Sequence, residues 1–164
     1  MQRAFAFSTL LVFSLLVGAP AGSQTLASEG LRADISAKLQ ALVDAANAGD
    51  ADAFFALASG SPNLVVVGDG RITRGLTDVR LNLKDMFVEQ GRYKWQVSGA
   101  EVLVAGSNVA IAVAPCQFTA VGDSAAVQLS GAITVVFARD WFWEDYKVVH
   151  SHRSTGRIGV AVAD

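Results

Sequence analysis

The sequence predicts an α+β fold, in which a curved, cone-shaped antiparallel sheet wraps around helices from the N-terminal half. Helical periodicity is confined to residues before Gly91, and the chain from Tyr93 onward consists of β-rich runs with short connections. Helices gathered in one half and strands in the other are typical of α+β proteins. A parallel sheet would need a crossover helix between successive strands, and the early helices argue against a lipocalin-like barrel.

The first helix is predicted over residues 31–48, because apolar residues recur there at intervals of three and four. This stripe consists of Leu31, Ile35, Leu39, Leu42, Val43 and Ala46. Asn47-Ala48-Gly49 is a stop signal, and Asp50 is placed to cap a shorter second helix that runs through Leu57. A third helical period runs from Leu76 to Phe87 and ends at Gly91.

The first strands lie between the second and third helices. Residues 64–67 and 71–74 flank a Gly68-Asp69-Gly70 turn, which predicts a β-hairpin. Longer β-rich runs follow the third helix, at residues 93–104, 108–120, 125–138 and 142–154. The connections between these runs are short, so we expect neighbouring runs to pair as an antiparallel meander.

The chain of 164 residues provides one domain with its own hydrophobic core. Residues 1–21 have the pattern of a secretory signal peptide, with a basic start, an apolar stretch and a small-residue cleavage site at Ala19-Pro20-Ala21. The remaining boundaries are a flexible mature N-terminus over residues 22–30, the domain over 31–156 and a C-terminal tail over 157–164. The apolar stretch is shorter than the roughly 20 residues of a spanning helix, so we expect a secreted or periplasmic protein without a stable membrane anchor after cleavage.

Composition argues against several kinds of site. The net charge is −2 and no basic run is present, which is unfavourable for nucleic-acid binding. The single Cys116 cannot form an internal disulfide and lies in an apolar run, as expected of a buried, inert thiol. A metal site built on His150 and His152 would need a further ligand that the spacing does not supply, and no glycine-rich phosphate loop is present. We therefore expect neither a metal nor a cofactor.

The best candidate site lies in the last β-rich run, which holds both histidines and an arginine. In a regular strand His150 and His152 share one face, and Val149, Ser151 and Arg153 share the other, unless a β-bulge intervenes. The histidines are either acid/base or hydrogen-bonding groups in a pocket, or inert groups on the outer sheet surface or at a subunit interface. Arg153 is predicted to face the pocket, where it would meet an anionic ligand or a cross-strand carboxylate.

Two segments carry a family resemblance: the YKVVHSHRST run over residues 146–155 and the AGDADAF turn over residues 48–54. Together with the element order, they resemble the nuclear-transport-factor-2-like superfamily, which includes SnoaL-like polyketide cyclases, ketosteroid isomerase and scytalone dehydratase. The last run is most similar to the VHxHRS segment of the calcium/calmodulin-dependent kinase II association domain. The resemblance covers roughly residues 31–156 and implies a cone-shaped α+β barrel that forms a homodimer.

The resemblance also implies a carboxylate-accepting pocket at Arg153, because the matching arginine of the association domain lies in such a pocket. The other pocket arginines of that family have no counterpart, since Pro115 and Thr134 stand at the aligned positions. Isomerase chemistry of the ketosteroid kind needs a pocket carboxylate as base, whereas the acidic residues here fall in predicted turns. The remaining candidate ligand contacts are Tyr93, Trp95 and Gln117, although core packing is the commoner role of a strand tryptophan.

Three functions remain open. The first is an exported SnoaL-like domain that binds a small organic molecule, anionic if Arg153 contacts it, in an apolar pocket. The second is an isomerase, dehydratase or cyclase with His150 or His152 as general base. The third is a homo-oligomeric assembly module resembling the kinase association domain. The candidate interface residues are three consecutive aromatics in the loop before the last strand: Trp141, Phe142 and Trp143.

Overall fold

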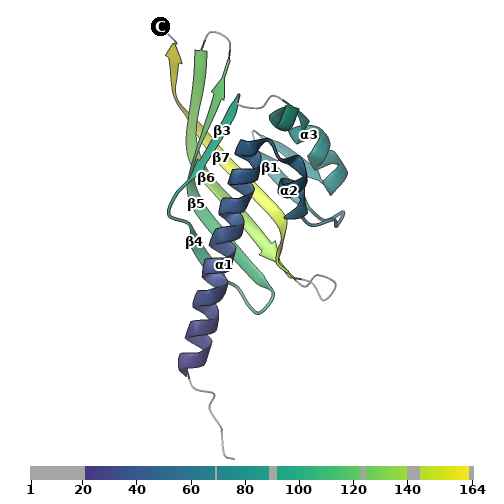
Figure 1. Cartoon of the computed structure of the whole chain (residues 1–164), viewed down its shortest axis with the longest axis vertical. Helices are drawn as coiled ribbons and strands as arrows, with labels where there is room; N and C mark the ends of the chain where they lie inside the picture. The colour runs from purple at the N-terminus through teal and green to yellow at the C-terminus, as the bar shows by residue number, and fades with distance from the viewer. Residues whose placement is uncertain (1–20, 69, 89–91, 123–124, 140–144, 163–164) are drawn as a thin grey trace, which may run out of the picture.

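The computed structural model describes residues 21–68, 70–88, 92–122, 125–139 and 145–162 (Figure 1). Its helices are α1 (Ala21–Ala48), α2 (Ala51–Ala56) and α3 (Leu76–Val88). Its strands are β1 (Val65–Gly68), β2 (Arg71–Arg74), β3 (Tyr93–Val97), β4 (Glu101–Val104), β5 (Val109–Val121), β6 (Ala125–Ala138) and β7 (Lys147–Val162). The element order confirms the predicted α+β fold. Among the described residues, no helix has the length and apolar character that crossing a membrane requires.

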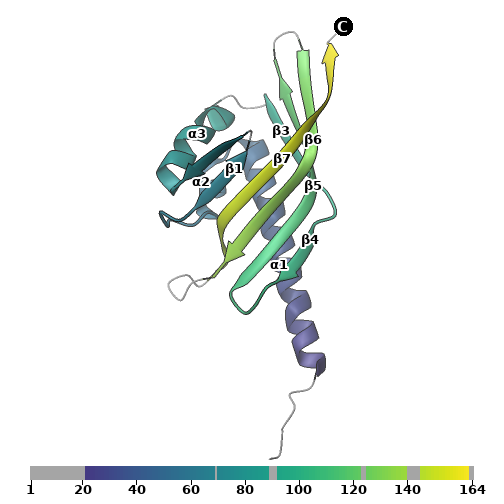
Figure 2. The same ribbon diagram turned by 180° about the vertical axis from the view of Figure 1, so that it is seen from behind.

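The strands form one curved, open sheet in the order β2-β1-β7-β6-β5-β3, and β4 also pairs with β5. All pairs are antiparallel except β1 with β7. This parallel pair arises because the last strand returns beside the hairpin that precedes α3. The helices cover one face of the sheet, and the view from behind shows the sheet in front of them (Figure 2).

The apolar stripe of α1 packs on the sheet as predicted, with Ile35, Leu39 and Leu42 buried in the core. The helix ends at Ala48 and is followed by Gly49, whose positive φ of 70° suits a glycine after a helix C-terminus. Asp50 then caps α2, because its Oδ1 accepts a hydrogen bond of 2.9 Å from the backbone N–H of Ala53.

Helix α1 begins at Ala21, whereas the sequence pattern predicted its start at Leu31. The segment 22–30, expected to be a flexible terminus, is therefore part of the helix. The apolar stripe marks where α1 is buried, but a helix can continue beyond its buried part, because each added residue gains a backbone hydrogen bond at little nucleation cost. At the other end of the chain, β7 continues to Val162, past the domain end predicted at Gly156.

The predicted strand over residues 93–104 is two strands, β3 and β4, which pair with different parts of β5. The break contains Gly99, whose φ of 56° is left-handed and favours glycine. Pro115 of β5 lies opposite this break, where its carbonyl accepts a hydrogen bond of 3.3 Å from Ser98 N–H. Because a proline has no N–H, Pro115 could not donate the hydrogen bond that an unbroken partner strand would accept, and the break between β3 and β4 lies at this position.

Candidate functional site

A cavity of about 360 Å³ lies between the helices and the inner face of the sheet, a size within the range typical of small-molecule sites. Its wall is mainly apolar and combines side chains from all three helices with others from β6 and β7. The principal apolar lining residues are Leu39, Leu42, Phe54, Phe55, Leu64, Val79, Leu83, Met86, Ile133, Val135 and Val148. The cavity is therefore suited to an apolar molecular body.

Arg153 and Trp95 meet at the cavity wall, although they are far apart in the sequence. The Arg153 guanidinium carbon lies 4.8 Å from the centre of the Trp95 ring and 5.4 Å from that of Phe118. Both distances are in the range of cation–π contacts. The guanidinium lies beside the backbone of β1, since a Cβ added at Gly68 would be in ordinary van der Waals contact with it, at 3.7 Å.

The backbone of Trp95 is fixed by α1. Asn47 donates from Nδ2 to the Trp95 carbonyl at 2.9 Å, and its Oδ1 accepts from the Trp95 N–H at 2.7 Å. The indole ring is also tilted against Phe118, with ring centres 4.7 Å apart. Its Nε1 is buried and has no hydrogen-bond partner among the described residues. A buried indole N–H usually finds an acceptor, so this donor is an exception in the part of the chain that the structure describes.

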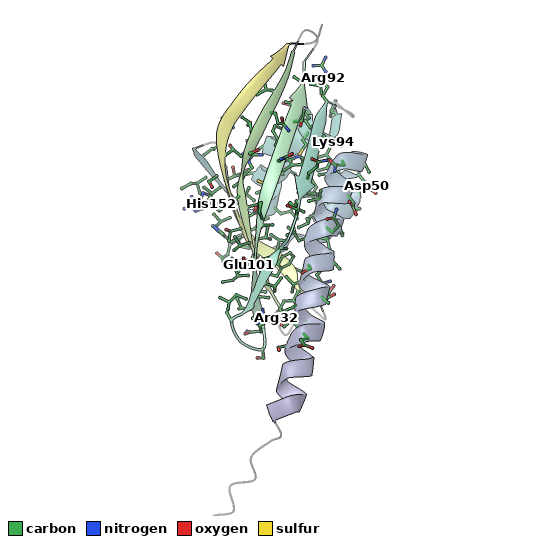
Figure 3. All side chains as sticks on the ribbon, turned by 90° about the vertical axis from the view of Figure 1, so that its left-hand side faces the viewer. Arg32, Asp50, Arg92, Lys94, Glu101 and His152 are labelled. Atoms are coloured by element: carbon green, nitrogen blue, oxygen red, sulfur yellow. The ribbon has the colours of Figure 1, made fainter. Side chains whose placement is uncertain are left out.

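A β-bulge in β7 decides which side chains reach the cavity. The register against β6 shifts between Val148 and His150, so that Val148, Ser151 and Arg153 line the cavity. His150 and His152 do not line it. His152 is exposed on the side of the sheet away from α1, as Figure 3 shows. The strand thus separates the arginine from both histidines.

The other predicted contacts lie outside the cavity lining. Tyr93 does not line the cavity but stacks on Phe118, with ring centres 5.7 Å apart. Phe118 is one of the two rings that contact the Arg153 guanidinium. Gln117 is exposed on β5, where its Oε1 is 3.5 Å from Gln128 Nε2. The aromatic loop residues 141–143 and the predicted signal peptide up to Pro20 lie outside the described residues, as do four of the acidic residues in predicted turns: Asp69, Asp123, Asp140 and Glu144.

The β1–β2 hairpin and α3 bring polar groups to the cavity that were not predicted from the sequence. Arg71, Thr73 and Asn82 line it, and Asn82 Nδ2 donates to Thr73 Oγ1 at 2.7 Å. The only sequence signal was the alternation of polar and apolar residues in the hairpin. Of the described residues that line the cavity, none is an aspartate, a glutamate or a histidine.

Cys116 is buried on β5, as predicted. Burial raises the pKa of its thiol, and the nearby positive charge of Arg153 opposes this shift only in part. A thiol of raised pKa is a poor nucleophile at neutral pH. Within the described part of the chain, no three metal-ligating side chains come together.

Solved structures with the same fold share little sequence with this chain. A nuclear-transport-factor-2-like protein from Salmonella enterica serovar Typhimurium superposes with a TM-score of 0.68 at 18% identity, over 80% of this chain and 96% of that one. A Streptomyces avermitilis protein of the same family, provisionally named a dehydratase, gives 0.68 at 16% identity, over 79% and 98%. The association domain of Caenorhabditis elegans CaMKII gives 0.61 at 16%, over 80% and 98%.

No curated protein matches this chain at a significant level. The sequence pattern of the SnoaL-like domain, in contrast, matches residues 35–157, which include the three helices' buried faces, the cavity and Arg153. The fold and this match together confirm the predicted resemblance: the chain belongs to the SnoaL-like domain family and has the nuclear-transport-factor-2-like fold.

Proposed function

We propose that this domain binds a small organic anion, with the apolar body in the cavity and the negative charge at Arg153. The observation that carries the proposal is the position of Arg153, a cation held over Trp95 at the wall of a mainly apolar cavity that Arg71 also lines. An anion that enters this cavity loses water, so a charge-assisted hydrogen bond to the guanidinium would compensate more strongly there than at the surface.

An isomerase or dehydratase is the alternative, since several proteins of this fold carry such names. General base catalysis needs a titratable group within hydrogen-bond reach of the substrate. The candidate bases His150 and His152 are absent from the cavity lining, and no described lining residue is acidic. The arrangement therefore supports ligand binding better than catalysis.

The test compares Arg153→Met with His152→Ala, a change on the outer face of the same strand. Thermal unfolding is followed with and without small aromatic carboxylates, because a ligand that binds only the folded protein raises the melting temperature. Arg153→Met should weaken carboxylate binding by about 10- to 100-fold, the usual effect of losing a hydrogen bond to a charged group. His152→Ala should leave binding unchanged. Equal binding by Arg153→Met and the native protein would contradict the proposal.

We also propose that two copies associate through the face of the sheet that the helices leave uncovered. Exposed apolar side chains gather there: Ile72 is 55% exposed, Leu103 59% and Val113 42%. One row of register partners crosses the sheet from Arg74 at β2 to Leu103 at β4, and passes through His150. The neighbouring row runs from Ile72 to Glu101 and passes through His152.

These rows carry a basic end at Arg74 and an acidic end at Glu101. A two-fold axis parallel to the strands would reverse the rows, and so bring Arg74 of one copy toward Glu101 of the other, as a closed dimer requires. Val113→Glu should shift the protein toward monomer in sedimentation, whereas Leu81→Glu, at a more exposed site on α3, should not. A native protein that is monomeric at micromolar concentration would refute this interface.

Export is a further proposal, supported by the sequence pattern of residues 1–21. When the chain is expressed with its own leader in a bacterial host, the mature protein should be recovered outside the cytoplasm and should begin near Gly22. N-terminal sequencing that finds Met1 retained in the membrane fraction would contradict it.

A further inference from the structure

We infer that Arg71 is a second anion-binding residue of the cavity, and that the ligand carries two carboxylates, one at Arg153 and one at Arg71. This inference deepens the proposed function and rests on it. Among the described residues that line the cavity, these two arginines are the only charged ones. Two positive charges at one cavity repel each other, and a ligand with two negative charges compensates both.

The β1–β2 hairpin places Arg71 on the inner face of the sheet. Thr73 Oγ1 accepts a hydrogen bond of 2.7 Å from Asn82 Nδ2 on α3, so the Thr73 side chain points toward the helices. Arg71 precedes Thr73 by two positions in β2, and alternate residues of a strand share a face. Ile72, between them, is exposed, as expected of a side chain on the opposite face. The Arg71 side chain therefore leaves the sheet on the side of the cavity.

Gly68 stands between the two arginines in one row of the sheet. On one side, it is the register partner of Arg71. On the other side, the parallel register of β1 with β7 ends at Val67 and His152, so Arg153 is the next position beside Gly68. The 3.7 Å between an added Cβ at Gly68 and the Arg153 guanidinium agrees with this register. The two arginine backbones are thus two strand spacings apart, about 10 Å.

The two arginines differ in their access to solvent. Arg71 is exposed, whereas Arg153 is half-buried against Trp95. Gly68 has no side chain, so the row between them presents only backbone to the cavity. A ligand can therefore reach from Arg153 at the cavity wall to Arg71 at its mouth without displacing a side chain of this row.

The cavity volume limits the body that joins the two carboxylates. At about 30 Å³ for each water-sized group, 360 Å³ holds on the order of a dozen non-hydrogen atoms. Most of the wall is aliphatic or aromatic, as at Leu83, Ile133 and Val135. The site therefore suits a compact dicarboxylate with a single apolar ring.

The test compares isophthalate with 3-acetylbenzoate, in which an uncharged acetyl group of similar shape replaces one carboxylate. In calorimetry, the native protein should bind isophthalate about 3- to 10-fold more tightly, an effect between that of an exposed ion pair and that of a buried charged hydrogen bond. Arg71→Met should abolish this preference and leave the affinity for 3-acetylbenzoate unchanged. Lys84→Met is the matched control, because it removes an exposed cation of α3 outside the cavity lining, and it should keep the preference.

Two further measurements distinguish an electrostatic role of Arg71 from a structural one. Arg71→Lys keeps the charge and should retain part of the preference for isophthalate, although it loses the two-pronged guanidinium contact. Added salt should reduce the preference of the native protein, because the attraction of an exposed cation is screened. The Arg71→Met variant should show no such salt dependence of the ratio between the two affinities.

The possible results separate the two proposals. If Arg153→Met weakens binding of both ligands, but the native protein does not prefer isophthalate or Arg71→Met keeps the preference, the role of Arg71 is refuted and the proposed function stands. If Arg153→Met binds both ligands as the native protein does, or the native protein binds neither, both proposals fail.

Discussion

Gly131 lies at a point where β6 and β7 approach too closely for any side chain. A Cβ added there would lie 1.9 Å from the carbonyl oxygen of Ser154 and 2.9 Å from both its carbonyl carbon and the Cα of Thr155. All three atoms belong to the backbone, so no side-chain rotation can relieve the overlap. Gly131→Ala should therefore force the two strands apart.

The displacement can be estimated from these distances. An ordinary contact begins at 3.4 Å, so the Ser154 oxygen must move by about 1.5 Å relative to the new methyl group. Overpacking of this kind costs about 1–3 kcal/mol, and the larger value is expected because backbone must move. For a domain of this size, the melting temperature should fall by roughly 4 °C per kcal/mol.

The shift should also reach the candidate site, because Gly131 pairs with Thr155 while its neighbours Ala132 and Ile133 pair with Ser154 and Arg153. Gly131→Ala should thus lower both the melting temperature and the affinity for carboxylates.

Gly156→Ala is the matched control, since it adds the same methyl group to β7 with no atom within 4 Å. Urea unfolding of both variants measures the free-energy changes. If Gly131→Ala is as stable as Gly156→Ala, the close approach of the strands is refuted.

Three further predictions concern stability. Phe137 is fully buried, so Phe137→Ala should reduce the free energy of unfolding by about 3–5 kcal/mol in urea titrations, and a loss below about 1 kcal/mol would contradict its core position. Asp50→Ala removes the cap of α2 and should cost about 0.5–2 kcal/mol, whereas Asp50→Asn should retain most of the stability. A hydrogen bond of 2.6 Å from Lys38 holds the pKa of Asp145 below its usual range, so this pair stabilises the fold above the unfolded-state pKa near about 4 and loses that effect as pH falls through the lower folded value. Lys38→Met should therefore cost less than about 1 kcal/mol at pH 7 and almost nothing near pH 2, and an equal cost at both would contradict the ion pair.

The sequence alone determined the local structure of the chain. The spacing of apolar residues predicted the buried face of α1, and turn glycines predicted the hairpin. The period of two along β7 also placed Arg153 and the histidines on opposite faces, which the structure bears out. These properties depend on neighbours within a few residues, so they can be derived from the pattern itself.

Only the tertiary structure decided which face of β7 points inward. The bulge near Val148 lets that residue and Arg153 line the same cavity. The alternation of residue types along β7 does not reveal this bulge. The pairing of Trp95 with Arg153 depends on strand order, because β3 and β7 are not adjacent in the sheet and meet only across its curvature. A binding site of this kind is made by contacts between distant segments, and these are fixed by the packing of the whole sheet on its helices.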